Sequence, residues 1–166
     1  MYAELHCISN YSFLRGASHP EELVKQAAAL GYSAIAITDE CTMAGIVKAH
    51  VAAKHNDIKL IIGSEFRLDE NLLLVLLAPN RIAYAQICNL ITIARQREKK
   101  NEYRMSLKDL ELTTSHCLAI WVPGKPSQKK EKQHHDKCGE KLKSVFSERL
   151  WLGLEVFPDG QSIGCY

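Results

Sequence analysis

Short runs of branched apolar residues alternate with helix-like segments along most of this 166-residue chain. The runs typical of buried strands are AELHC (3–7), SAIAITD (33–39), KLIIGSEF (59–66), LLLVLLA (72–78), CLAIWVP (117–123) and LWLGLEVF (150–157). Such alternation favours parallel strands joined by helical crossovers, because a parallel connection must travel back along the sheet. The sequence therefore predicts an α/β fold, either a barrel or an open sheet.

Three helices are predicted between the first five of these strands. The first begins near Pro20 and ends at Gly31, with acidic residues in its first turn, where they interact favourably with the helix dipole. The other two cover about residues 43–55 and 81–97. The inner stripe expected on the last helix consists of Ile82, Ile87, Leu90 and Ile93.

We expect one domain over residues 1–157, followed by an irregular tail over 158–166 that is rich in turn-forming residues. The charged stretch over about 124–138 begins with a Gly-Lys-Pro break and is predicted to be an exposed loop that enters a helix over EKLKSVFSER (140–149). The abrupt change to turn formers after the last strand-like run suggests that the domain is incomplete at its carboxyl-terminal end.

Composition excludes several classes of protein. Hydrophobic residues make up 46% of the chain and charged residues 24%, as in an ordinary globular domain. No apolar run approaches the roughly 18 residues that cross a bilayer, and the six cysteines include no close pair. We therefore expect a cytoplasmic protein with reduced thiols and no membrane partner. The basic surplus of residues 95–149 is interrupted by acids, which favours a solvated surface over a nucleic-acid site.

Polar side chains lie at the ends of three predicted strands. His6 ends the first strand, Asp39 and Glu40 end the second, and Glu65 ends the third. Ligands bind at the carboxyl ends of parallel strands in α/β folds, so these side chains are candidates for one site. Imidazole with carboxylates suits Zn, Mn or Fe, which would activate a water molecule for phosphoryl chemistry. In a purely structural alternative, Asp39 caps the turn or helix that follows it and Glu65 is a strand end in contact with solvent. His6 is then a histidine at the rim of the sheet whose hydrogen bonds are satisfied within the fold.

Four consecutive blocks resemble the PHP (polymerase and histidinol phosphatase) domain that begins bacterial DNA polymerase III alpha subunits. They are ELHCISNYSFLRGASHPEELVKQAAALGYSAIAITDECTMAGIVKAHVAAK, IKLIIGSEF, LLLVLLAPN and CLAIWVPG. The segments FLRGASHPEEL and ITDEC are most similar to the error-prone branch of the family. The resemblance implies a distorted seven-stranded (β/α)7 barrel, here incomplete at the C-terminal end, fused to polymerase domains.

The same resemblance implies functions for the parent protein. It would be a nucleotidyltransferase acting in damage-induced translesion synthesis, whose partners are its own polymerase domains, other mutasome subunits and, indirectly, DNA. The polymerase machinery itself is missing from these 166 residues. The chain alone is therefore expected to be inactive as a polymerase.

The ligand pattern of metal-binding relatives is only partly kept. The His-x-His motif retains His6 but has Ile8 in its second position, and the histidine of the fourth strand aligns with Leu73. The family's histidine after the second-strand aspartate aligns with Glu40. The last metal ligands of the family would lie beyond residue 166. We therefore expect no catalytic residue, no bound metal and no other cofactor.

Arg15 aligns with an acidic residue of the family, and a guanidinium there would repel a cation. We expect it to substitute for the cation by pairing with Asp39, Glu40 or Glu65, since a desolvated carboxylate cluster needs a neutralising charge.

Three functional hypotheses follow from the resemblance. The first is a non-catalytic structural module of an error-prone polymerase subunit. The second is a Zn- or Mn-dependent phosphoesterase or 3′–5′ exonuclease that uses His6, Asp39, Glu40 and Glu65. The third is a stand-alone product of a disrupted gene that binds a partner through its barrel or its basic second half.

Overall fold

The computed structural model describes residues 2–69, 72–123 and 129–154, with the side chains of 129–135 excepted. The elements are β1 (Ala3–Cys7), α1 (Pro20–Ala29), β2 (Ala34–Ile37), α2 (Ile46–His55), β3 (Lys59–Arg67), β4 (Leu73–Leu77), α3 (Arg81–Gln96), α4 (Leu107–Thr113), β5 (Leu118–Val122), α5 (Lys129–Phe146), the 3-10 helix η1 (Ser147–Arg149) and β6 (Leu150–Leu152). All six predicted strands are present, although residues 155–157 of the last lie outside the described part, as does the tail predicted over 158–166.

The strands form one sheet in the order β1-β2-β3-β4-β5-β6. The pairs β1–β2, β2–β3 and β5–β6 are parallel, whereas β3–β4 and β4–β5 are antiparallel. The expectation of parallel strands throughout was therefore wrong for β4. Only residues 68–72 separate β3 from β4, which is too short for a crossover and forces the chain to turn back.

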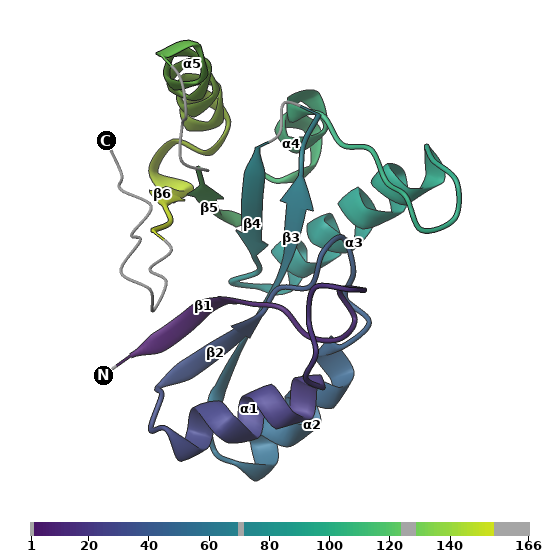
Figure 1. The fold of residues 1–166 in the computed structure, drawn as a ribbon, viewed down its shortest axis with the longest axis vertical. Coiled ribbons are helices and arrows are strands. Elements are labelled where there is room, and N and C mark those ends of the chain that lie inside the picture. The colour runs from purple at the N-terminus through teal and green to yellow at the C-terminus, as the bar shows by residue number, and fades with distance from the viewer. Residues whose placement is uncertain (1, 70–71, 124–128, 155–166) are drawn as a thin grey trace.

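The sheet curls so that its helices lie outside and a concave face lies inside (Figure 1). Within the described residues β1 and β6 are its two edges, and they do not pair with each other. The fold is thus an α/β half-barrel, which confirms the predicted incomplete barrel.

Alternating residues of the strands divide between two sides of the sheet. Ile35 and Ile37 of β2 pack against α1 and α2 in one apolar core. Leu74 and Leu76 of β4 pack in a larger core with α3, α4 and α5. Ala36, Val75, Leu77 and Val122 form a third cluster with partly buried residues that line the concave face. This two-residue period is what a strand covered on both faces requires.

Two helices differ from the prediction. Residues 129–138 belong to α5, so the exposed loop predicted over 124–138 was wrong there; 124–128 lie outside the described part. Lysine, glutamate and glutamine are good helix formers, and Cys138, Leu142 and Phe146 supply a buried stripe at four-residue spacing. On α3 the buried residues are Ala83, Ile87, Leu90 and Ala94, while Ile82 is exposed. The helix α4 was not predicted.

In the described residues, no helix combines the length and apolarity that crossing a membrane would require.

Candidate functional site

The carboxyl ends of β1, β2 and β3 meet at one rim of the sheet. An isolated parallel bridge between Glu40 and Glu65 continues the pairing of β2 with β3 beyond the end of β2. His6 comes from β1, and Arg15 comes from the loop that connects β1 to α1. The structure brings His6, Arg15, Glu40 and Glu65 into direct contact.

Glu65 is the centre of this cluster and its side chain is fully buried. The Nε2 atom of His6 lies 2.6 Å from Oε2 of Glu65. Arg15 donates from one terminal nitrogen to Oε1 of Glu65 and from the other, at 3.3 Å, to Oε2. The fork of the guanidinium therefore engages both carboxylate oxygens, which is the geometry that makes such pairs strong.

Charge and burial act in opposite directions on Glu65. Burial is the largest influence and would raise its pKa, but hydrogen bonds from His6 and Arg15 and their positive charge outweigh it. The pKa of Glu65 is consequently below its ordinary value of 4.5. The hydrogen bond to Glu65, and after it the contact with Glu40, raises the pKa of the Arg15 guanidinium against the lowering effect of burial. Both groups are therefore charged at neutral pH.

Glu40 connects the cluster to the segment between α3 and α4. Arg15 donates to its Oε2 at 2.6 Å, and the Tyr103 hydroxyl donates to its Oε1 at 2.8 Å. The same hydroxyl accepts from the backbone N–H of Arg67 at 2.8 Å. Burial, with a further contribution from Glu40, raises the pKa of Tyr103, so the phenol keeps its proton. The guanidinium of Arg95 lies over the Tyr103 ring, 5.3 Å from its centre.

Asp39 faces the loop that follows β1 and is almost completely buried. Its Oδ1 accepts from the backbone N–H of Ser9 and from the hydroxyl of Ser12, and its Oδ2 accepts from the hydroxyl of Ser9, each at 2.7 Å. The ion pair expected for Arg15 is thus present with Glu40 and Glu65, whereas the oxygens of Asp39 hold the loop.

These residues, as they are arranged, do not fit a metal ion. The guanidinium of Arg15 lies against the two glutamates that would supply oxygen ligands, and a cation there would be repelled by it. Within the described ranges no group of three or more His, Cys, Asp or Glu side chains could hold a metal. Burial also raises the pKa of Cys7 and of Cys41, both to about 11, so neither thiol is a thiolate nucleophile at neutral pH.

Sequence reasoning missed Ser9, Ser12, Tyr103, Arg67 and Arg95. The two serines lie close to His6 in the sequence and could have been considered as partners of a buried aspartate. Tyr103 is 63 residues from Glu40 and carries no sequence signal of its role.

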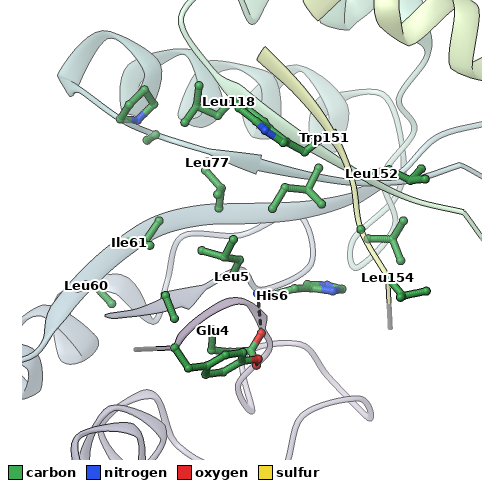
Figure 2. A pocket seen from close by; sticks show the side chains of 17 residues that line it. Glu4, Leu5, His6, Leu60, Ile61, Leu77, Leu118, Trp151, Leu152 and Leu154 are labelled. Carbon is green, nitrogen blue, oxygen red and sulfur yellow. Dashed lines mark hydrogen bonds between the residues drawn. The ribbon is translucent and has the colours of Figure 1, made fainter. Parts of the chain in front are cut away.

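The concave face of the sheet forms a second candidate, an apolar cavity of about 830 Å³. Figure 2 shows Leu5, Ile61, Leu77, Leu118 and Trp151 around it, contributed by five different strands. Glu4 and His6 are the acidic and basic side chains in its lining. Its chemistry suits apolar contact rather than catalysis.

The Glu65 cluster predicts how stability depends on pH. A carboxylate whose folded pKa is lowered stabilises the fold above its unfolded pKa and loses this effect as the pH falls through the folded value. We expect the free energy of unfolding to decrease below about pH 4.5, the ordinary value for this group. Urea unfolding between about pH 7 and about pH 3 would measure this. Glu65→Gln should flatten the acid limb, and Glu148→Gln, at an exposed position, should not; equal slopes in both variants would contradict the assignment.

A family model described as PHP domain matches residues 4–155. An error-prone DNA polymerase of Methylococcus capsulatus is 49% identical over 161 residues, which cover 96% of this chain and 15% of the relative. Those of Idiomarina loihiensis and Pseudomonas aeruginosa are 51% and 47% identical over 155 residues each, covering 93% of this chain and 14% of the relative. The chain thus spans about 15% of the length of these relatives.

Two solved structures share the fold. An amidohydrolase from Chromobacterium violaceum, with bound sulfate and no metal, gives a TM-score of 0.61 over 86% of this chain and 74% of its own. A protein from Bifidobacterium adolescentis described as a metal-dependent phosphoesterase gives 0.58 over 85% and 74%. Both are 15% identical in sequence, so they bear on the fold alone.

Proposed function

Since this chain belongs to the PHP domain family, we propose that it is the amino-terminal module of an error-prone DNA polymerase subunit and carries no chemistry of its own. The subunit would act in damage-induced translesion synthesis in the cytoplasm. This chain would support the polymerase domains, which would contact DNA and other mutasome subunits. The support for the first part is the identity of about 50% with error-prone polymerases.

The single observation that carries the non-catalytic role is the position of Arg15. Its guanidinium contacts the carboxylates of both Glu40 and Glu65, where a catalytic metal would need free oxygens. A fixed positive charge neutralises a buried carboxylate as an ion would, but it can neither polarise a phosphoryl oxygen nor activate a bound water. We infer that Arg15 substitutes for the cation. The metal site would then be degenerate and without catalytic chemistry, while its buried carboxylates would still be neutralised.

The alternative is a metal-dependent phosphoesterase or 3′–5′ exonuclease. The retention of His6, Asp39 and Glu65 near the ends of adjacent strands favours it. In that case Zn or Mn would have to displace Arg15 from Glu65.

Metal analysis distinguishes the two proposals. Chain dialysed against Zn or Mn should retain less than stoichiometric metal and show no phosphatase or exonuclease activity that a chelator abolishes. Ile8→His combined with Arg15→Asp restores ligand types and removes the competing charge, so this variant should retain more metal. Stoichiometric metal in the natural chain, with activity lost on chelation, would replace the structural proposal by the enzymatic one.

A further inference from the structure

Two adjacent apolar side chains project from the loop beside the Arg15 cluster. Phe13 is 84% exposed and Leu14 is 89% exposed, the highest values among the large hydrophobic residues of the described chain. On either side of them, Ser12 is buried and Arg15 is held by Glu40 and Glu65. The exposed pair is therefore the tip of a loop whose base is fixed.

The loop of residues 9–16 is held by hydrogen bonds on both sides of its exposed tip. The carboxylate of Asp39 accepts hydrogen bonds from Ser9 and Ser12. The Ser12 hydroxyl accepts a hydrogen bond from the backbone N–H of Glu40 at 2.9 Å. The backbone N–H groups of Arg15 and Gly16 both donate to the carbonyl of Ser12 at 3.0 Å. A Cβ at Gly16 would lie 2.0 Å from the carbonyl oxygen of Ser9, so the loop closes too tightly there for any other residue.

The backbone at the tip is also unusual. Leu14 has a φ of +60°, in the left-handed region where a residue with a Cβ is disfavoured. A leucine in this conformation, with its side chain in water, gains nothing from packing in the chain alone. Rigid apolar side chains presented in this way are typical of interface anchors, because little conformational freedom is lost when they bind.

We propose that Phe13 and Leu14 anchor this domain in an apolar pocket on the polymerase part of the same subunit. The contacts of Asp39 and Arg15 would then hold the loop in the conformation that exposes Phe13 and Leu14. This inference rests on the proposed function, since it requires the chain to be part of a longer polymerase polypeptide. It names the surface through which the structural module would act.

The size of the tip argues for a covalently connected partner. A phenylalanine buries roughly 150–250 Å², whereas a stable interface between separate proteins needs about 1,000 Å² or more. A second copy of the chain or a freely diffusing protein would thus gain too little from this contact alone. A tethered partner benefits from a high effective concentration, and about 85% of each relative's length lies outside the matched region.

Photo-cross-linking in a full-length subunit tests the proposal. Residues 1–154 would replace the matched region of the Methylococcus capsulatus polymerase, with a photoreactive phenylalanine analogue at position 13. Retained primer extension by this chimera would show that it is folded. Position 13 should cross-link to apolar residues of the polymerase part, and the same analogue at Leu112, which is exposed on α4, should not cross-link to that pocket. Absence of cross-links from position 13, or cross-links only to a second copy, would overturn the proposal.

Substitutions separate docking from folding. Phe13→Ala and Leu14→Asn remove the anchors at exposed positions, and asparagine tolerates the positive φ of position 14, so the unfolding midpoint of the 166-residue chain should not fall. In the chimera, the contact between this domain and the polymerase part should open at least about tenfold more often in these variants. Hydrogen exchange or proteolysis at the domain junction would measure this opening. Unchanged opening would refute the anchor role while leaving the metal-free structural role intact. Metal-dependent activity would refute the structural role and leave the cross-linking result standing.

Discussion

Replacing Arg15 with methionine should lower the free energy of unfolding by about 3 kcal/mol. The side chain of Glu65 is 0% exposed, and without the Arg15 guanidinium its charge would be left with His6 at 2.6 Å and with Arg67, whose Nε lies 3.9 Å from Oε1. Removing one partner of a buried pair is far more damaging than losing a surface pair, because the remaining charge stays desolvated. Urea unfolding at neutral pH is the measurement.

Two matched variants make this prediction specific. Glu65→Gln removes the buried negative charge that Arg15→Met would leave unneutralised. The double variant Arg15→Met/Glu65→Gln should therefore lose less unfolding free energy than the sum of the two single losses. Arg104→Met removes an exposed arginine that lies 3.6 Å from Asp69, and it should cost less than about 1 kcal/mol. If Arg15→Met and Arg104→Met had similar effects, the structural importance of the cluster would be refuted.

Asp39→Ala should destabilise the chain by a similar amount, about 3 kcal/mol. The substitution leaves one backbone N–H and two hydroxyls of the loop without their acceptor in a buried place. Amide exchange at Ser9 should accelerate together with the loss of stability, because this N–H donates directly to the carboxylate. Equilibrium unfolding combined with hydrogen exchange would measure both effects.

Asp136→Ala is the control for this prediction. Asp136 is exposed on α5, so its replacement should change stability by no more than about 0.5 kcal/mol. Asp39→Asn keeps the shape and one carbonyl oxygen and should fall between the two. An Asp39→Ala variant as stable as Asp136→Ala would show that the loop does not depend on this carboxylate.

Most strands were predictable because they are short apolar runs rich in branched residues, whereas β1 contains Glu4 and His6 and has Leu5 as its one branched apolar residue. Their directions were not, since periodicity is the same in parallel and antiparallel strands; the short 68–72 connection was the available clue. The stripe of α3 was misplaced because two alanines, Ala83 and Ala94, are buried where larger neighbours were expected. The helix over 129–138 was missed because its charged composition also suits a solvated loop.

The site was predictable where neighbouring strands determine it. His6, Glu40 and Glu65 meet at the rim as expected, and Arg15 contacts both glutamates. The role of Asp39 depends on the exact path of the loop, which no spacing rule provides. Tyr103 joins the cluster through tertiary packing of the segment between α3 and α4, so its contact with Glu40 could not be inferred from sequence.

The cluster at the rim has a consequence for how distant parts of the chain are held together. It joins His6 to Glu65 across 59 positions, Arg15 to Glu65 across 50 and Glu40 to Tyr103 across 63. None of these contacts is a disulfide, so they are long-range cross-links that need no oxidant. Acid, rather than a thiol reductant, is the agent that loosens them, because it protonates the glutamates.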